Sequence, residues 1–296
     1  MTPVDDAARP LSGPAQNDMS APVSKPGASN LVLRVASAAV MAPLALGAAY
    51  WGSWPFAVFW AAAGIAVLWE WITLVAGRDH KLMLWSCAGA IAVAALLAWR
   101  ERPMVGLLIV ALGALAASIF APRKERLWIL AGMAYAGSMM LAPIVLRNDS
   151  WLGFIAIVLI FAVVWTTDVL AYFTGRAIGG PKLMPSVSPK KTWSGAIGGT
   201  LGAIVAAVLV ATLFGGLNKV AIAGVALVLS ILSQAGDLLE SHIKRHFGAK
   251  DASTLIPGHG GVMDRLDGFW AAVIAACLIG LLRGGFEAPA RGLLMW

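Results

Sequence analysis

Charged side chains are scarce in this chain of 296 residues. Asp, Glu, Lys and Arg make up 12% of it, whereas hydrophobic residues make up 59%. A soluble globular protein usually carries about twice that share of charge. The deficit excludes a soluble enzyme, a disordered chain and a nucleic-acid binder, even though the net charge is +7.

Several signatures of other protein classes are missing. The two cysteines, Cys87 and Cys277, both lie inside apolar segments and form no CxxC pair, which excludes a disulfide framework and a thiolate metal site. The Walker sequence Gly-x4-Gly-Lys-Ser/Thr does not occur, which excludes a P-loop ATPase. No sequence repeat supports an inverted-repeat transporter.

Long apolar runs are abundant instead. Runs of about 20 apolar residues recur, and each is enough for a helix to cross a hydrocarbon core of roughly 30 Å. The sequence therefore predicts an all-α, polytopic integral membrane protein with about nine transmembrane helices. The predicted spans are 31–50, 54–76, 82–99, 103–121, 127–146, 151–173, 195–214, 218–236 and 268–283. The third span is short, so the third and fourth could instead form a re-entrant pair.

The chain divides into three predicted regions. Residues 1–30 are rich in Pro, Ser, Ala and Asp and contain no apolar run, so they are expected to form a flexible N-terminal tail. Residues 31–150 are expected to hold the N-terminal transmembrane helices. Residues 151–296 are expected to form a C-terminal transmembrane catalytic region, because they contain both long polar stretches outside the tail.

Basic residues indicate the orientation. Most of the 22 Lys and Arg residues fall on the side of the membrane that holds the N-terminus. The positive-inside rule makes that side cytoplasmic. We therefore expect a multi-pass protein of the cell (inner) membrane, with the N-terminus and the two polar loops, 174–194 and 237–267, in the cytoplasm.

Three acidic residues, Glu70, Asp168 and Asp237, stand inside or beside apolar spans, where an unpaired carboxylate costs several kcal/mol. For Glu70 a helix–helix hydrogen bond or an interfacial position is favoured over catalysis, because no second polar residue accompanies it. Asp168, Tyr172 and Arg176 share one helical face. That face is either a snorkelling pair between Asp168 and Arg176 or part of a functional site.

A second polar stripe follows the eighth span. Asp237, Glu240, Ser241 and Lys244 recur at i, i+3, i+4 and i+7, on a helix that Gly248 is expected to end. A solvated face stabilised by the Glu240–Lys244 pair explains those two residues. It does not explain why Asp237 lies next to the bilayer.

The sequence after this stripe indicates a metal-assisted phosphate site. Glycines around one histidine, in Pro257-Gly258-His259-Gly260-Gly261, allow backbone N–H groups to converge on an anion. Mg²⁺ prefers one or two carboxylates together with the oxygens of a bound phosphate. The neighbouring cations are Lys244, Arg245, Lys250 and Arg265, and the neighbouring carboxylates are Asp237, Asp264 and Asp267.

The other polar loop leads into a helix. Lys190, Lys191 and Thr192 come immediately before the seventh span, where a helix N-terminus attracts anions and a hydroxyl can cap it. A basic loop that only sets topology is the alternative. Within the span, Gly195 with Gly199 and Gly198 with Gly202 permit close helix packing, for which a place inside the fold is favoured, although a dimer seam also fits.

These blocks resemble the signature of the phosphatidate cytidylyltransferases, also called CDP-diacylglycerol synthases. The downstream blocks are Ser241-His-Ile-Lys244-Arg245, Lys250-Asp251, Pro257-Gly-His259-Gly260-Gly261 and Asp264-Arg265-Leu-Asp267. The upstream blocks are Asp168, Ala171-Tyr172, Gly175-Arg176 and Ser188-Pro189-Lys190-Lys191-Thr192. Together they cover roughly residues 165–270, about a third of the chain. Ser194 departs from the pattern, since many members carry Glu there.

The resemblance implies a reaction in which CTP and phosphatidic acid give CDP-diacylglycerol and pyrophosphate. It also implies Mg²⁺ as the cofactor, and whether a second cation binds is left open. It implies metal ligation by Asp168, Asp237 and Asp264. The catalytic residues that it implies are Lys244, Lys250, Asp251, His259, Arg265 and Asp267. The substrate-binding residues that it implies are Tyr172, Arg176, Ser188, Lys190, Lys191, Thr192, Ser241, Arg245, Gly260 and Gly261.

The expected partners are CTP, phosphatidic acid and the lipid bilayer, without nucleic acid, and a homodimer is allowed. A CTP-dependent lipid-alcohol or polyprenol kinase is the nearest alternative. An ion-coupled transporter that uses Asp168 and Asp237 is disfavoured, because it gives no reason for a Gly-His-Gly-Gly turn beside four cations. The enzyme interpretation requires the two polar loops to converge, with Asp168 and Asp264 in one pocket.

Overall fold

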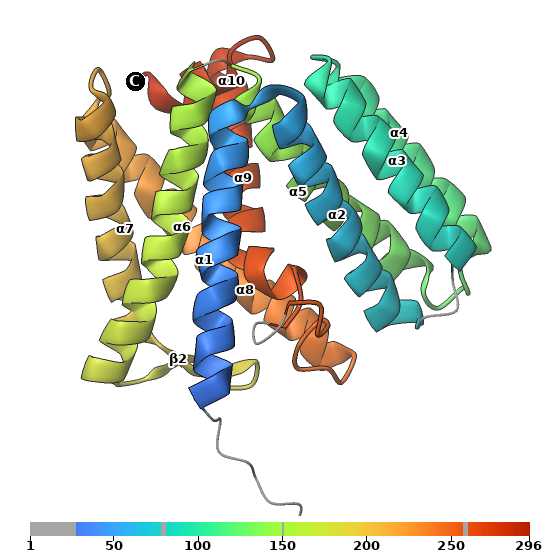
Figure 1. Ribbon diagram of the computed structural model, residues 1–296. Coiled ribbons are helices and arrows are strands. Elements are labelled where there is room, and N and C mark those ends of the chain that lie inside the picture. The colour runs from blue at the N-terminus through green and yellow to red at the C-terminus, as the bar shows by residue number, and fades with distance from the viewer. Residues whose placement is uncertain (1–27, 78–80, 150, 257–259) are drawn as a thin grey trace, which may run out of the picture.

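The computed structural model describes residues 28–77, 81–149, 151–256 and 260–296, with the side chains of the first helix described from Ala36. Helices dominate the described chain (Figure 1). They are α1 (Ala28–Trp51), α2 (Ser53–Ala76), α3 (Lys81–Trp99), α4 (Pro103–Phe120), α5 (Arg126–Arg147), α6 (Trp151–Ile178), α7 (Trp193–Phe214), α8 (Lys219–His246), α9 (Met263–Gly284) and α10 (Pro289–Leu294). An antiparallel hairpin, β1 (Lys182–Met184) and β2 (Ser188–Thr192), joins α6 to α7.

The predicted membrane class is confirmed, since each predicted apolar segment coincides with one of the helices α1 to α9. Within the described residues, the 8 helices α2 to α9 are long and apolar enough to cross a membrane. In α1 the apolar stretch Ala36–Trp51 is shorter, so a ninth crossing stays a prediction. Helices α3 and α4 have 19 and 18 residues, which favours two crossings over a re-entrant pair.

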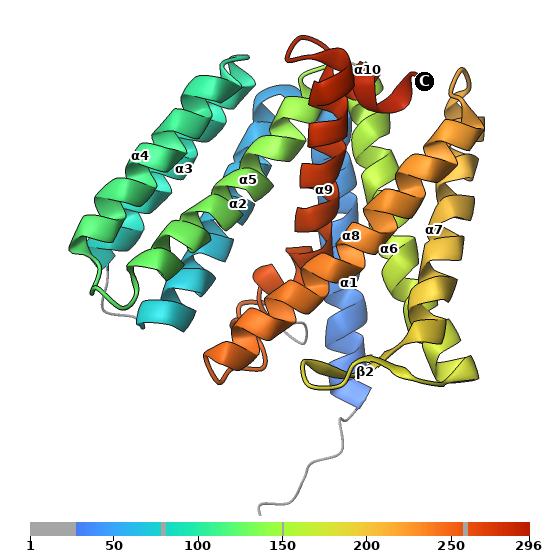
Figure 2. The same ribbon diagram turned by 180° about the vertical axis from the view of Figure 1, so that it is seen from behind.

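Helix α9 joins the two halves of the molecule. Figures 1 and 2 show α3 and α4 side by side at one edge, α7 at the opposite edge, and α9 between them. The ring of Trp60 on α2 stacks on Phe269 at 4.9 Å, and Tyr135 on α5 stacks on Trp270 at 4.4 Å. Helix α9 packs on helices from both sides of residue 150. The predicted division into two transmembrane regions at that residue therefore stays a prediction.

Glycines bring α7 against α6. A Cβ atom on Gly195 would lie 2.7 Å from the carbonyl oxygen of Ala171, and one on Gly199 would lie 2.6 Å from that of Thr167. Any larger residue would therefore push the two helices apart. The prediction that this glycine pattern packs inside the fold is confirmed, and the homodimer stays a prediction.

Both polar stretches are partly helical, since α6 runs to Ile178 and α7 begins at Trp193. Helix α8 continues to His246 and α9 begins at Met263, so the predicted loop 237–267 is helical at both ends. Gly248, with φ 72°, follows the end of α8 as predicted. The hairpin in 174–194 was not predicted, because that segment lacks the alternation of polar and apolar residues that marks a strand. Its pairing depends on the ends that α6 and α7 bring together, where the N–H of Trp193 donates to the carbonyl of Pro181 at 3.1 Å.

Candidate active site

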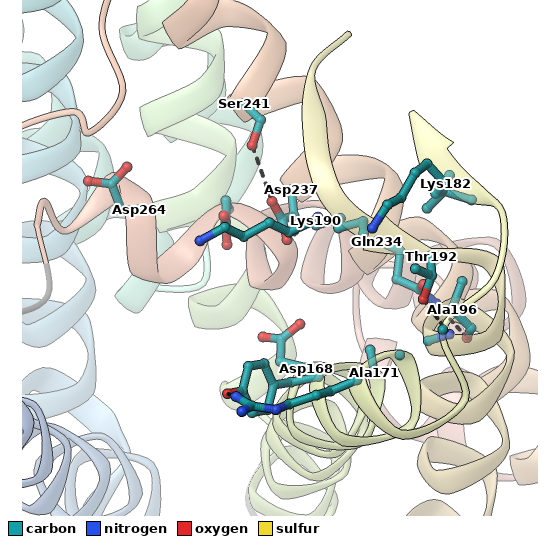
Figure 3. A pocket seen from close by; sticks show the side chains of 18 of the residues that line it. Asp168, Ala171, Lys182, Lys190, Thr192, Ala196, Gln234, Asp237, Ser241 and Asp264 are labelled. Carbon is teal, nitrogen blue, oxygen red and sulfur yellow. Dashed lines mark hydrogen bonds and ion pairs between the residues drawn. The ribbon is translucent and has the colours of Figure 1, made fainter. Parts of the chain in front are cut away.

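A cavity of about 690 Å³ lies where α6, the hairpin, α7, α8 and α9 meet (Figure 3). Asp168 from the sixth predicted span and Asp264 from the second polar loop both line it, so the predicted convergence is confirmed. The predicted site residues that line it are Asp168, Tyr172, Arg176, Lys190, Lys191, Thr192, Asp237, Ser241, Lys244, Asp251, Asp264, Arg265 and Asp267. Its volume is within the range of about 300 to 1,000 Å³ that is usual for small-molecule sites.

Opposite charges share this cavity. The basic residues of the lining are Arg176, Lys182, Lys190, Lys191, Lys244 and Arg265. The acidic residues are Asp168, Asp237, Asp251, Asp264 and Asp267. Such a mixture suits a ligand with several phosphate groups, because the basic side chains attract phosphate oxygens and the carboxylates attract the accompanying cations.

The polar face of α6 is part of the cavity. Asp168, Tyr172 and Arg176 all line it, as their shared helical face predicts. Arg176 donates to the Tyr172 hydroxyl at 3.0 Å and forms no ion pair with Asp168. Among the described residues, the predicted snorkelling pair between Asp168 and Arg176 is therefore wrong. The other prediction, that this face is part of a functional site, remains.

Asp168 and Asp237 both point into the cavity, from α6 and α8 (Figure 3). Asp237 forms an ion pair with Lys191 and accepts a 3.4 Å hydrogen bond from Ser241. The carboxylate of Asp168 makes no hydrogen bond or ion pair with the described residues, so its oxygens are available to a ligand.

Lys244 is enclosed rather than solvated. Its ammonium group lies 2.7 Å from Oε2 of Glu240 and also forms an ion pair with Asp264. The predicted i,i+4 pair is present, but Glu240 is 0% exposed and Lys244 is 8% exposed, so the expectation of a solvated face is wrong. The amphipathic pattern did not reveal that α9 covers this face of α8.

Asp264 holds the backbone that precedes α9. Besides Lys244, its carboxylate accepts from the N–H of Ala252 at 3.0 Å and from the N–H of Gly261 at 2.7 Å. The N–H of Gly260 donates to the carbonyl of Ile256 at 3.1 Å. These two glycine amides are therefore already bonded, which contradicts the expectation that both are free to bind an anion.

The start of α7 has the predicted cap. Thr192 accepts a 3.2 Å hydrogen bond from the N–H of Gly195, and Lys190 and Lys191 lie beside it in the cavity lining. Ser194, the residue that departs from the family pattern, donates to the carbonyl of Gly179 and lies 3.0 Å from the Thr192 hydroxyl. Ser194 thus ties the end of α6 to the start of α7.

The remaining predicted site residues are not part of the cavity lining or lie outside the described residues. His259 lies outside the described residues, as do Pro257 and Gly258. Arg245 is exposed and donates to the carbonyl of Ala249 at 3.2 Å. The described candidates that do not line the cavity are Ser188, Arg245, Lys250, Gly260 and Gly261.

Two polar side chains of the lining were missed by the sequence analysis. Lys182 adds a cation from β1, and Gln234 adds an amide from α8. The amide of Gln234 donates to Thr200 at 3.0 Å, and Thr200 accepts from Ser230 at 3.1 Å. The available signal was a set of polar side chains at helical spacing inside apolar spans, with Gln234 three residues before Asp237.

The structural interpretation of Glu70 is confirmed. This carboxylate is 0% exposed and is not in the cavity lining. It accepts hydrogen bonds from the N–H groups of Val262 and Met263 at 2.8 and 2.7 Å, at the start of α9. Glu70 is therefore bonded to the helix that carries three of the predicted site residues.

Fold and site together define a class of protein. A bundle of apolar helices with a charged cavity at one polar end is suited to an enzyme that joins a phosphate-bearing lipid to a water-soluble phosphate compound. Sequence comparisons identify the family: the model of the cytidylyltransferase family matches residues 32–282. The chain belongs to this family of nucleotidyltransferases.

Curated relatives agree with this assignment. A phosphatidate cytidylyltransferase of Brucella suis is 41% identical over 264 residues, which is 88% of this chain and 97% of the relative. One from Brucella abortus is 42% identical over 257 residues, or 86% of this chain and 94% of the relative. One from Haemophilus influenzae is 44% identical over 131 residues, covering 43% of this chain and 46% of the relative.

Proposed function

We propose that this membrane enzyme transfers CMP from CTP to phosphatidic acid and releases pyrophosphate and CDP-diacylglycerol. The observation that carries the proposal is the shared cavity, in which basic and acidic residues from two distant segments face each other in a chain of the cytidylyltransferase family. We infer the lipid substrate, phosphatidic acid, from the names of the relatives. The apolar helices suit the protein to the membrane, where that lipid resides.

The chemistry demands charge neutralisation more than proton transfer. An oxygen of the lipid phosphate attacks the α-phosphorus of CTP, and the bond from that phosphorus to the bridging oxygen of the β-phosphate breaks. The lipid phosphate is already an anionic nucleophile, so the reaction needs no strong general base. The main obstacle is repulsion between two phosphate groups, which Lys190, Lys191 and Arg265 are placed to reduce.

We further propose that Mg²⁺ is the cation used. The described parts of the chain contain no group of three His, Cys, Asp or Glu side chains that could hold a metal ion. Asp168 and Asp237 nevertheless fit Mg²⁺, because it is commonly bound by one or two carboxylates together with substrate phosphates and water. A bound Mg²⁺ would supply positive charge at the phosphates. A ligand role for Asp264 stays a prediction, since its oxygens already accept from Lys244 and two amides.

The direct test uses the full chain in detergent micelles with labelled CTP and phosphatidic acid. We expect CDP-lipid and pyrophosphate as products, and loss of both when EDTA removes divalent cations, with recovery on adding excess Mg²⁺. A lipid kinase would instead give a phosphorylated lipid and CDP. Formation of CDP with an added lipid alcohol, and no CDP-lipid with phosphatidic acid, would overturn the proposal.

The cavity is proposed to open toward the cytoplasm of a bacterial inner membrane. Cysteine labelling tests this orientation, because the native Cys87 and Cys277 are buried. Lys124→Cys, in the turn after α4, should react with an impermeant maleimide only in inverted vesicles. Lys219→Cys, at the start of α8, should react only in intact spheroplasts. The reverse pattern would place the active site on the outer face.

A further inference from the structure

Glu70 is a fully buried acid that the proposed chemistry does not use. It lies on α2, yet its partners come 183 to 193 residues later in the chain. Its Oε1 accepts from the Ser253 hydroxyl at 2.6 Å and from the N–H of Val262 at 2.8 Å, and its Oε2 accepts from the N–H of Met263 at 2.7 Å. Three charge-assisted hydrogen bonds and the positive end of α9 offset the cost of burying this carboxylate.

The N-terminus of α9 depends on this distant acid. The N-cap residue Val262 offers no side-chain cap. The first N–H groups of a helix lack partners within the helix and must find them elsewhere. At the start of α9, Glu70 accepts from Val262 and Met263, while Asp264 accepts from Gly261.

Glu70 and Asp264 together bond residues 252–253 and residues 261–263, and these two described stretches are here called the clasped segment. At its beginning, Asp264 accepts from the N–H of Ala252 and Glu70 accepts from Ser253. At its end, a Cβ atom on Gly261 would lie only 2.6 Å from Oε1 of Glu70. A side chain at this position would therefore displace the Glu70 carboxylate, and these residues cannot shift without breaking bonds to the two acids.

The clasped segment is followed directly by residues of the cavity. Arg265 and Asp267 lie in the first turns of α9 and line the cavity. A displacement of about 1 Å in catalytic groups can cost about a hundredfold in rate. We propose that Glu70 is a positioning residue, whose carboxylate fixes the start of α9 so that Arg265 and Asp267 face the substrates. This inference rests on the proposed function.

The test replaces Glu70 with glutamine in the full chain. Glu70→Gln keeps the size but turns an NH₂ group toward N–H donors, so we expect kcat to fall about tenfold or more. The KM for CTP should stay within about threefold, because the nucleotide contacts themselves are retained. Trp71→Phe is the matched control: it removes the neighbouring bond from Trp71 to the carbonyl of Trp128 without touching the clasped segment, and should keep the wild-type kcat.

Two further measurements separate positioning from general destabilisation. Ser253→Ala removes one of the three bonds to Glu70, so it should lower kcat less than Glu70→Gln and add little in the double variant. Amide hydrogen exchange in Glu70→Gln should rise at residues 260–266 and remain unchanged in α5. A merely structural role would raise exchange across the bundle.

Three outcomes would overturn the inference. The first is a kcat of folded Glu70→Gln within about twofold of the wild-type value. The second is a loss of kcat in Trp71→Phe equal to that in Glu70→Gln. The third is increased hydrogen exchange throughout α5 in Glu70→Gln. If the wild-type protein makes no CDP-lipid, the proposed function fails. The exchange pattern still shows then whether Glu70 holds the start of α9.

Discussion

Replacing Asp237 with asparagine should reduce CMP transfer by at least about a hundredfold while leaving the protein folded in the membrane. Asparagine has nearly the same size but no charge. The substitution would leave Lys191 without its ion-pair partner and would remove a carboxylate that faces Asp168 across the cavity. The loss of activity is measured from initial rates with labelled CTP and phosphatidic acid over a range of Mg²⁺ concentrations.

Glu240→Gln is the comparison for this prediction. Glu240 lies one helical turn from Asp237 but is absent from the cavity lining, and its partner is the buried Lys244. Because Lys244 keeps its ion pair with Asp264, we expect a modest loss of stability and a smaller loss of activity than in Asp237→Asn. An equally deep loss in both variants would reject the structural role of Glu240, and full activity in Asp237→Asn would remove Asp237 from the site.

Replacing Arg265 with alanine should lower kcat/KM by about a hundredfold. Arg265 is exposed and lines the cavity, and its side chain makes no hydrogen bond or ion pair with the described residues, so its guanidinium group is available to a phosphate. Lysine should restore only part of the activity, because an ammonium group cannot form the two parallel hydrogen bonds that a guanidinium group forms with phosphate oxygens. Steady-state kinetics with each substrate varied in turn measures both effects.

Arg123→Ala is the control for Arg265→Ala. Arg123 is exposed in the turn between α4 and α5, and it does not line the cavity. The variant changes the net charge by the same amount, so it corrects for long-range attraction of anionic substrates. Equal losses in the two variants would show that Arg265 acts through general charge alone, and complete rescue by lysine would exclude bidentate binding.

Much of the fold could be predicted because its signals are local. The length of each apolar run and the glycine that ends α8 depend on neighbouring residues, and these predictions agree with the helices. The hairpin could not be predicted, because β1 and β2 carry no strand pattern and pair only when α6 and α7 bring their ends together. Gln234 was missed for a related reason, since a single amide in an apolar span does not show which cavity it faces.

For the site, the residue types were predictable but several of their environments were not. Lys244 and Glu240 were expected to be a solvated pair, whereas both are buried against Asp264. The amides of Gly260 and Gly261 were expected to bind an anion, yet they donate to Ile256 and Asp264. A pattern within one helix or turn does not reveal which other element packs on it.

The sequence by itself determined that this is a polytopic membrane protein and that its candidate site residues gather in two polar segments. Hydrocarbon imposes a minimum length of apolar residues and penalises every charge, so both features are visible in the order of residues alone. Only the tertiary structure decided which acids face the cavity and which hold the backbone. Asp168 and Asp237 face it without anchoring backbone amides, whereas Glu70 anchors the start of α9 from more than 180 residues away, because a buried charge is stabilised by whichever partners the packing of helices supplies.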